Sequence, residues 1–443
     1  MSFCCLDRLS QLEAHAGELA AAVRVLAGQI RGGSTLCGRE NKPHPLGLPE
    51  NYLEEAQQAR GSILSSLMKM QTLLLGPTDF LQQLMLHTQL LASLQWLGAL
   101  QVLACIPIGG SVPVKDVAEL TGVPEMQLRR IVRMTATTAG FLQQPQPDEV
   151  AHSPLSAPFV LMPGYLDAAM FLAETAAPAA LQTEKATQLY AASDLPMESP
   201  FSLAFPMAES FPRAYEQQPR LQRQWPAYLR YAIGDMDAAP SDVDMYLGPL
   251  RVGNSSVVEV DAASTELASR LEKRYPTIRF IVQLSEVEKA TWKVDEPPMS
   301  SRLIVQYCSN GAPQPVVGAA LYLMRIPPSS PVTPVSSILA QLAAQLKLHL
   351  GTLRMNTSVS LVLYARLLPD AGSMSVESEA QALLRDVTFF QLSKQREMSS
   401  WDIIDLVNSV SDSTGRLVLV KTMRSPKSPI VTFEIRYQEL VHF

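Results

Sequence analysis

The sequence predicts an α/β protein with a helical N-terminal part and a C-terminal, mostly parallel, doubly wound sheet that ends in an antiparallel hairpin. Three observations predict it. Residues 257–286 (VVEVDAASTELASRLEKRYPTIRFIVQLSE) run as apolar strand, turn, helix and apolar strand, which is a βαβ unit. Strand and helix patterns then alternate to the C-terminus. Upstream, residues 112–152 have the pattern of a winged helix-turn-helix.

The 443 residues, 47% of them hydrophobic, are enough for two or three packed domains. We expect N-terminal helices at 1–77 with a Gly/Pro-rich linker at 31–50, followed by a winged-helix domain of the dimerisation type at 78–163. A helical connecting region at 164–246 then leads to a Rossmann-like domain at 247–443.

Composition excludes several classes of function. With 36 basic and 42 acidic residues, the net charge of −6 provides no attraction toward DNA or an acidic membrane. The five cysteines have no metal-type spacing and the six histidines are scattered, so we expect reduced thiols and no metal site. Neither a signal peptide nor an apolar stretch of membrane-spanning length is found, so we expect a soluble intracellular protein.

Three helices are expected before the winged helix, at 3–30, 51–75 and 78–105. The first is amphipathic, and the third is strongly apolar. The first two form a helical pair that either serves as a dimerisation arm or partner-binding element, or packs on its own domain. The sequence leaves these alternatives open.

Within the winged helix, Pro124 opens the second helix after a turn at Thr121-Gly122. Three arginines lie on its outward face: Arg129, Arg130 and Arg133. They allow two interpretations, DNA recognition or a solvated face of a structural module. We favour the structural one, because three basic residues are a weak signal and Glu125 and Asp148 are nearby.

The strands of the C-terminal domain are expected at 256–260, 279–283, 302–306, 358–364, 416–421 and 430–437. The main helices between them are expected at 264–274, 334–350, 377–385 and 399–409. The last two strands are joined by the short turn RSPKSP and should form the antiparallel hairpin.

The turn after the first strand carries the main functional information. In nucleotide-binding sheets this turn is normally glycine-rich, because the backbone approaches the ligand closely and adopts positive φ angles. Here it is Asp261-Ala262-Ala263-Ser264-Thr265, without glycine. The scaffold is present and the ligand-binding turn is absent, which argues against catalysis.

Four segments resemble the plant- and fungal-type O-methyltransferases that use S-adenosylmethionine: LTGVPEMQLRRIVR, VVEV with FIVQ, PQPVVGAALYLMR and SSWDIIDLV. The resemblance implies a methyltransferase-like Rossmann domain. It also exposes departures from active members, which have Asp-Val-Gly-Gly-Gly-x-Gly after the first strand. The acidic residue that holds the ribose is replaced by Leu284, and Ser329, Ser330 and Pro331 stand where active members have His-Asp-Trp.

The loss of these motif residues should strongly weaken cofactor binding and slow methyl transfer. A charged hydrogen bond is worth about 1.5–3 kcal/mol and a β-carbon at positive φ costs roughly 1–2 kcal/mol, so cofactor affinity should fall about a thousandfold or more. Loss of the general base removes a further ~10²–10⁴ in rate. His349, the one histidine in the catalytic half besides His442, lies about twenty residues beyond the base position, where we expect a core or solvent-facing side chain.

The segment from QLLASLQWLGALQVLAC to SPLSAPFV, followed by LDAAMFLAETAAPAALQ, more closely resembles the aflatoxin-pathway transcriptional co-activators of filamentous fungi. These are methyltransferase-like proteins of aromatic polyketide gene clusters. The resemblance implies a non-catalytic, nuclear co-activator that binds a pathway-specific binuclear zinc-cluster transcription factor. We therefore predict no catalytic, cofactor-binding or metal-binding residues, no cofactor, no direct contact with nucleic acid or membrane, and a homodimer.

The alternative is an enzyme. It would be an O-methyltransferase with an altered cofactor turn, or a methyltransferase fold repurposed for another reaction on a polyketide intermediate. A replacement base in the pocket would favour this alternative.

Overall fold

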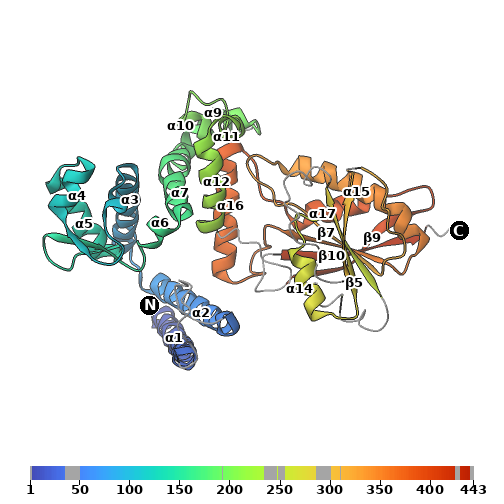
Figure 1. Cartoon of the computed structure of the whole chain (residues 1–443), viewed down its shortest axis with the longest axis horizontal. Helices are drawn as coiled ribbons and strands as arrows, with labels where there is room; N and C mark the ends of the chain where they lie inside the picture. The colour runs from blue at the N-terminus through green and yellow to red at the C-terminus, as the bar shows by residue number, and fades with distance from the viewer. Residues whose placement is uncertain are drawn as a thin grey trace. The chain divides into compact units, whose positions relative to one another are not determined.

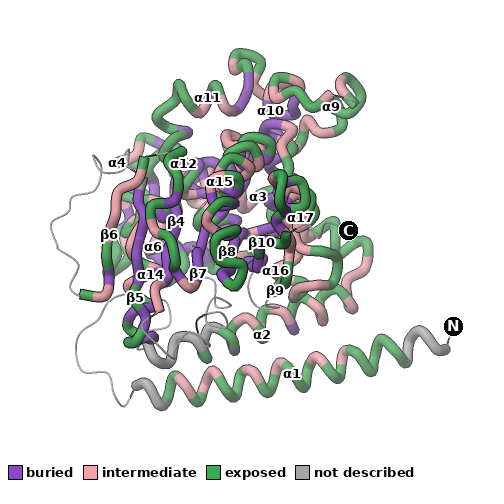
Figure 2. The backbone as a smooth tube through the Cα atoms, turned by 90° about the vertical axis from the view of Figure 1, so that its right-hand side faces the viewer, coloured by how far each residue is buried: buried purple, intermediate pink, exposed green. Residues whose placement is uncertain are grey.

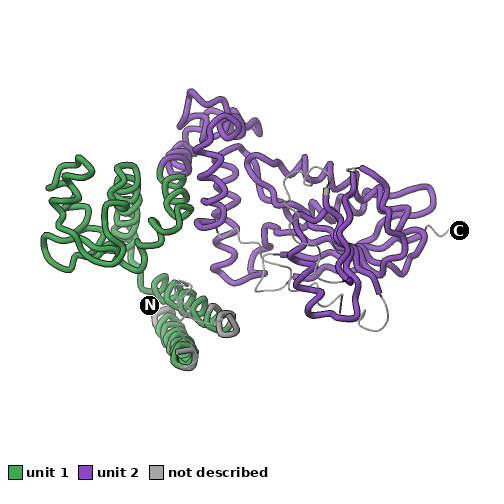
Figure 3. The backbone as a smooth tube through the Cα atoms, viewed as in Figure 1, with its two compact units in different colours: residues 1–173 green, residues 174–443 purple. Residues whose placement is uncertain are grey.

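The computed structural model describes residues 2–34, 50–191, 193–233, 247, 255–285, 301–309, 311–424 and 430–439. Most of the predicted linker at 31–50 lies outside these residues. The chain divides into two compact units, residues 1–173 and 174–443 (Figure 3). The division falls inside the predicted connecting region 164–246, and the four predicted domains remain a prediction.

The first unit is mainly helical. Its α-helices are α1 (Ser2–Ser34), α2 (Glu50–Leu74), α3 (Pro77–Ala99), α4 (Val114–Thr121), α5 (Glu125–Ala139), α6 (Pro158–Leu161) and α7 (Pro163–Phe171), with a 3₁₀ turn η1 (Val102–Cys105) after α3. Strands β1 (Ser111–Pro113), β2 (Leu142–Gln143) and β3 (Glu149–His152) form a small antiparallel sheet in the order β1-β3-β2. Helix α4, the turn at Gly122, helix α5 and this sheet are the elements predicted for a winged helix-turn-helix.

Helix α3 ends earlier than predicted. The predicted helix 78–105 stops at Ala99, because Gln101 takes a left-handed conformation (φ 56°) and the chain tightens into η1. The end of α3 packs closely on α7. A β-carbon on Gly98 would approach Leu166 and Met170 to 2.8 Å, so only glycine fits there without a shift of the neighbouring side chains.

Helix α5 carries the three arginines on which the DNA-recognition hypothesis depends. The side chain of Arg129 is half-buried and forms ion pairs with Glu125, at 2.7 Å, and with Asp148 of the loop between β2 and β3. Arg130 and Arg133 are exposed. One of the three arginines therefore ties the helix to its own hairpin, as the interpretation of a structural module expects.

The second unit begins with short helices and continues into the sheet. The helices are α8 (Ala177–Ala180), α9 (Thr183–Tyr190), α10 (Pro200–Ala204), α11 (Phe211–Gln217), α12 (Pro219–Tyr231), α14 (Glu266–Arg274), α15 (Val335–Met355), α16 (Val376–Ser393) and α17 (Ser400–Ser409), with the short helical turns η2 (Leu172–Ala176) at the division of the units and η3 (Pro196–Glu198). Helix α16 runs eight residues beyond its predicted end at 385. It packs on α8, α10 and α11, and its Phe389 ring lies 6.1 Å from Trp225 of α12.

The sheet has seven strands in the order β6-β5-β4-β7-β8-β10-β9. They are β4 (Ser256–Val260), β5 (Arg279–Ser285), β6 (Leu303–Cys308), β7 (Leu321–Arg325), β8 (Ser360–Arg366), β9 (Gly415–Arg424) and β10 (Ile430–Glu439). Strands β6, β5, β4, β7 and β8 are parallel, and β10 is antiparallel to β8 and β9. The predicted fold class, with its terminal antiparallel hairpin, is confirmed.

One prediction for the sheet was wrong, because only six strands were expected. The segment 321–325 (LYLMR) is a seventh strand, β7, and it lies at the centre between β4 and β8. Four of its five residues are buried, as expected for a central parallel strand covered on both faces. Its short length concealed the strand pattern.

Two hydrophobic cores cover the two faces of this sheet (Figure 1). On one face, α15 and α17 pack against side chains such as Val258, Tyr322 and Leu363. On the other, α14 covers Val257, Phe280 and other residues of the central strands. Burial on both faces fixes the register of the strands and hence the positions of the loops at their carboxyl ends.

A buried ion pair holds α16 to the segment before α17. Arg385 donates to both carboxylate oxygens of Glu397, and their side chains are 4% and 2% exposed. We predict that Arg385→Met lowers the free energy of unfolding by about 3–5 kcal/mol, because it leaves the Glu397 charge buried without a partner. The double variant Arg385→Met/Glu397→Leu should recover much of this loss, as measured by urea-induced unfolding.

The matched control is Arg213→Met, which breaks an exposed pair with Glu209. It should change the free energy of unfolding by less than about 1 kcal/mol. Equal effects of the Arg385 and Arg213 changes would contradict the assignment of a structural role to the buried pair.

Candidate functional site

The candidate site lies at the carboxyl edge of the sheet, between β4 and β7. The chain passes from β4 to β5 and β6 on one side, and β7 and β8 lie on the other side, so the strand order reverses at this point. Doubly wound sheets bind ligands in the crevice at such a reversal, beyond the carboxyl ends of the strands. The glycine-free turn 261–265 leaves β4 at this position.

Within that turn, Asp261 takes the positive φ angle (54°) that glycine usually takes. The predicted cost of a β-carbon at positive φ therefore applies at this one residue of the turn. The backbone N–H of the buried Ala262 donates to the carbonyl oxygen of Gln283 at 2.8 Å, which ties the turn to β5. The side chain of Asp261 accepts a hydrogen bond from Gln345 of α15 at 3.3 Å.

Two cavities adjoin at this hydrogen bond. The first, of about 370 Å³, is lined by residues that include Arg325, Pro327 and Leu342. The second, of about 220 Å³, is lined by residues that include Gln283 and His349. Asp261 and Gln345 line both cavities, so their contact marks the boundary between them. Small-molecule sites usually span about 300–1,000 Å³, which the first cavity reaches and the second does not.

The second cavity is bordered by a buried network of three side chains, Gln283, Gln314 and His349. Gln283 and Gln314 exchange reciprocal amide hydrogen bonds of 2.6 and 2.9 Å. The Gln314 amide nitrogen lies 3.1 Å from Nε2 of His349, and its oxygen also accepts the N–H of Val316. All three side chains are less than one-tenth exposed. The two amides thus use their hydrogen bonds within the protein, which leaves few for a ligand.

His349 is a core histidine, one of the two expected possibilities. Its Nδ1 lies 2.9 Å from the carbonyl oxygen of Gln345. Because a carbonyl only accepts, Nδ1 carries the proton and Nε2 accepts the hydrogen bond from Gln314. Burial lowers the pKa of the imidazole, which favours this neutral form. Both ring nitrogens are engaged, so His349 is not placed as a replacement general base.

The expected ribose position, Leu284, does not face the cavity. Its side chain is 1% exposed and belongs to the hydrophobic core beneath α14. The neighbouring Gln283 lines the cavity instead. On the cavity side of β5, the group near the expected ribose position is therefore the amide of Gln283, which is already paired with Gln314.

The expected position of the general base is also occupied by a structural contact. Ser329 is buried, and its hydroxyl accepts the backbone N–H of Met398 at 3.2 Å. Ser330 forms a bridge to Thr333, and α15 does not begin until Val335. The hydroxyl of Ser329 thus binds the segment before α17 rather than standing ready for proton transfer.

A buried carboxyl group, that of Glu259 in β4, is the strongest electrostatic feature near the site. The side chain is 6% exposed and hydrogen-bonds with Tyr364 of β8, while its Oε2 has no hydrogen-bond partner. Burial raises the pKa of this carboxyl to about 7, and the hydrogen bond with Tyr364 and the charge of Arg325 oppose the shift. Burial also raises the pKa of the Tyr364 hydroxyl. Glu259 shares its face of β4 with Val257 of the core beneath α14, and it lines neither of the two cavities.

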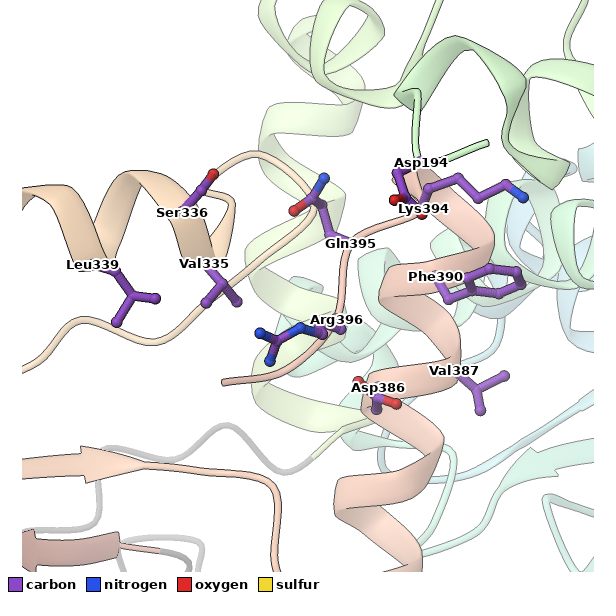
Figure 4. Close-up of a pocket in the computed structure, with 10 residues that line it drawn as sticks. All are labelled: Asp194, Val335, Ser336, Leu339, Asp386, Val387, Phe390, Lys394, Gln395 and Arg396. Atoms are coloured by element: carbon purple, nitrogen blue, oxygen red, sulfur yellow. The ribbon is translucent and has the colours of Figure 1, made fainter. Parts of the chain in front are cut away.

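A third cavity, of about 590 Å³, lies between the first turns of α15 and the end of α16 (Figure 4). Val335, Leu339 and Phe390 supply apolar walls, and Lys394 and Arg396 extend in opposite directions. The Lys394 ammonium lies 3.5 Å from the Tyr190 carbonyl and over the Phe390 ring. Arg396 forms a bidentate pair with Asp402, so the protein's own groups engage both cations.

Three glutamines that line the two cavities were not predicted from the sequence: Gln283, Gln314 and Gln345. The sequence motifs pointed only to Asp261, Leu284, Ser329 and His349. One signal was available, because Gln283 is a polar residue inside an otherwise apolar strand of a sheet that is buried on both faces. The pairing with Gln314, which is 31 residues away, required the fold.

Comparison with known proteins identifies the relatives of this chain. Residues 9–75 match the family described as the trypacidin cluster transcriptional coactivator tpcD N-terminal domain. The monodictyphenone cluster transcriptional coactivator mdpA of Emericella nidulans is 42% identical, over 98% of this chain and 99% of that protein. The agnestins biosynthesis cluster transcriptional coactivator AgnL9 of Paecilomyces divaricatus is 43% identical, over 97% of this chain and 98% of its own.

Among solved structures, LepI in complex with SAM is similar, with a TM-score of 0.59 and 16% identity over 95% of this chain and 100% of that chain. This level of identity supports the fold alone. Within the described residues, no cluster of three or more His, Cys, Asp and Glu could hold a metal ion. In the same part of the chain, the search for a helix of membrane-spanning length and apolarity found none.

The raised pKa of Glu259 predicts a pH dependence of stability. Between the ordinary value of 4.5 and the folded-state value of about 7, the folded protein binds more protons than the unfolded chain. The free energy of unfolding should therefore fall as the pH rises through this window, by an amount on the order of 3 kcal/mol, and level off above it. Glu259→Gln should remove this fall and unfold at higher urea concentration than the parent at pH 8.

The control is Glu266→Gln, which neutralises an exposed carboxyl group on α14 of the same unit. Its urea midpoint should follow that of the parent at pH 5 and at pH 8. Parallel pH profiles for the parent and Glu259→Gln would refute the assignment of a protonated buried carboxyl.

Proposed function

We propose a non-catalytic regulatory function, starting from a premise that full-length similarity establishes: this chain belongs to the family of fungal transcriptional coactivators of secondary-metabolite gene clusters. In this proposal the chain promotes expression of an aromatic polyketide cluster by binding a pathway-specific binuclear zinc-cluster transcription factor. It acts in the nucleus, which it enters with that partner, as a homodimer, and it neither touches DNA directly nor requires a cofactor.

One observation carries the absence of catalysis: the protein's own hydrogen bonds occupy the cofactor side of the sheet. Asp261 is bonded to Gln345, and Gln283 is bonded to Gln314, which in turn donates to His349. A ligand that displaced the bonds among Gln283, Gln314 and His349 would leave buried groups without partners, at about 1–3 kcal/mol for each unsatisfied group. The bond from Gln345 to Asp261 is exposed, so breaking it costs less. The mutual pairing of these side chains supports a scaffold rather than a ligand site.

The alternative, a methyltransferase or a repurposed enzyme of the same fold, rests on the cavity of about 370 Å³ next to Asp261. This cavity has the volume of a small-molecule site, and it combines apolar walls with Asp261 and Arg325. The similar structure of LepI was solved with SAM. The two proposals differ in whether this chain binds that cofactor.

Direct DNA recognition by α5 is the third hypothesis, and the ion pairs of Arg129 weaken it. A recognition helix reads base edges with free donors, whereas Arg129 donates to Glu125 and Asp148. Arg130 and Arg133 remain exposed and provide the test.

We predict that calorimetric titration of the purified protein with S-adenosylmethionine and S-adenosylhomocysteine gives no binding heat at millimolar ligand. The physical reason is the network of paired amides, together with the absence of an acidic partner for the ribose at Leu284. Thermal unfolding with and without ligand is a second readout, since a ligand of the folded state raises the melting temperature. Micromolar binding would favour the enzyme instead.

We also predict that the purified chain associates with the zinc-cluster regulator encoded beside it, and that deletion of its gene lowers the transcripts of the cluster. The variant Arg130→Ala/Arg133→Ala should leave promoter occupancy unchanged, because contact with DNA is assigned to the regulator. Arg129 is kept in this test because it holds the loop between β2 and β3. Absence of association together with unchanged transcripts would refute the proposal, and loss of occupancy would support direct DNA binding.

A further inference from the structure

The N-terminal helices α1 and α2 form an antiparallel hairpin with a heptad seam. Leu12, Leu19 and Leu26 recur every seven residues along α1 and are half-buried. On α2, Ala59 and Ser66 have the same spacing and are buried. Such a repeat keeps one stripe of each helix against its neighbour, as in a coiled coil.

Two contacts show the direction and the sides of the pair. Gln29 of α1 donates to Glu55 of α2. The hydrogen bond with His15, and also the positive charge of Lys69 of α2, lower the pKa of Glu18. The C-terminal half of α1 therefore lies beside the N-terminal half of α2. Glu18 and Lys69 both follow the seam on one side, so that side of the hairpin is charged.

Helix α1 carries a second seam, which no other part of the structure covers among the described residues. Leu9, Ala16, Val23 and Ile30 recur every seven residues, and all four are exposed. Figure 2 shows that the described part of α1 is exposed or intermediate along its length. The positions between them, at the alternating spacing of four and three, are Glu13, Ala20 and Ala27. Of the side chains 7–31 of α1, none is fully buried.

The second seam continues onto α2, on the side away from Lys69. Antiparallel pairing places Leu74 near Leu9 and Leu67 near Ala16, and both leucines are exposed. The result is an apolar stripe along the hairpin, with alanines on its floor and larger side chains beside them. Small residues in a row let a second helix approach closely, so the stripe fits a helix.

The charges of α1 are divided between its two halves. Residues 7–18 contain three carboxylates and one arginine, whereas residues 19–31 contain two arginines, Arg24 and Arg31, and no carboxylate. Two copies of α1 in antiparallel orientation would bring each acidic half beside a basic half. Parallel copies would place like charges together, which is unfavourable.

We infer that α1 packs antiparallel against α1 of a second copy of this chain, so that two hairpins form a four-helix bundle about a twofold axis near Ala20. This register sets Leu9 opposite Ile30 and Ala16 opposite Val23, large against large at the ends and small against large toward the axis. It also sets Glu13 beside Arg24. The contact is isologous, as closed dimers require. The inference rests on the proposed homodimer and gives it an interface.

The test uses the full chain and measures molar mass by light scattering at tens of micromolar protein. In the variant Arg24→Glu/Arg31→Glu, both halves of α1 are acidic, and in Asp7→Arg/Glu13→Arg both are basic. Each variant alone should have half the mass of the parent, because like charges then face each other. An equimolar mixture of the two should regain the parent's mass, which only pairing of α1 with α1 explains.

Two matched controls separate the interface from folding. Ala20→Trp places a bulky ring at the proposed axis and should halve the molar mass. Ala21→Trp adds the same ring one residue along, outside the second seam, and should leave the molar mass unchanged. Lys115→Glu/Lys185→Glu makes the same charge change as the acidic variant outside the hairpin and should keep the parent's mass. Circular dichroism should show equal helix content in all of these proteins.

A parent that is monomeric, or a mass unchanged in the two charge variants and Ala20→Trp, would overturn the inference. It would also be overturned if these variants keep their mass but lose capture of the zinc-cluster regulator, because the stripe would then bind that partner. Cluster transcripts are measured separately. If the variants keep the parent's mass while deletion of the gene lowers cluster transcripts, only the interface is refuted. If the variants have half the parent's mass while deletion of the gene leaves cluster transcripts unchanged, only the proposed function is refuted.

Discussion

At the carboxyl ends of β4 and β5, buried polar side chains need hydrogen-bond partners, and the exposed Asp261 lies next to them at the edge of the sheet. In a ligand-binding sheet, part of that demand is met by the ligand. Here it is met by the chain: Asp261 bonds to Gln345, and Gln283 bonds to Gln314, which bonds to His349. Because Gln345 and His349 belong to α15, these bonds also fix that helix over the sheet.

Most of the fold followed from sequence pattern, because burial on both faces gives central strands continuous apolar runs. Strands β4, β5, β8 and the terminal hairpin were expected within a few residues of their observed bounds. Strand β7 was missed because five residues between proline-rich segments carry too little periodicity to distinguish a strand from a lead-in to a helix. The end of α3 was misplaced because the helix stops where Gln101 takes a left-handed conformation, which the local apolar pattern does not encode.

The loss of the cofactor and base motifs could be predicted from the sequence, whereas the hydrogen-bonded side chains found at the site could be predicted less well. The absence of glycine from the turn that begins at Asp261, and the serine at position 329, can be read from the sequence, because each is a change of residue type at a motif position. The pairing of Gln283 with Gln314 is not, because Gln283 lies in β5 and Gln314 lies between β6 and β7, and the two amides meet only once the sheet has formed. Leu284 shows the same limit: which face of β5 a residue occupies depends on the pleat.

A protein that fills its own ligand site still has reasons to keep the sheet. The two cores that bury β4, β7 and β8 supply most of the apolar contact of the second unit, so the scaffold is stable without a ligand. In the proposed non-catalytic function, selection on chemistry no longer acts on the carboxyl edge, and the surfaces become the functional part of the molecule. In α1, apolar side chains at seven-residue spacing remain in contact with solvent, a state that a long helix does not favour without a partner. We therefore place the functional constraint on this chain in its helical surfaces, with the sheet as their support.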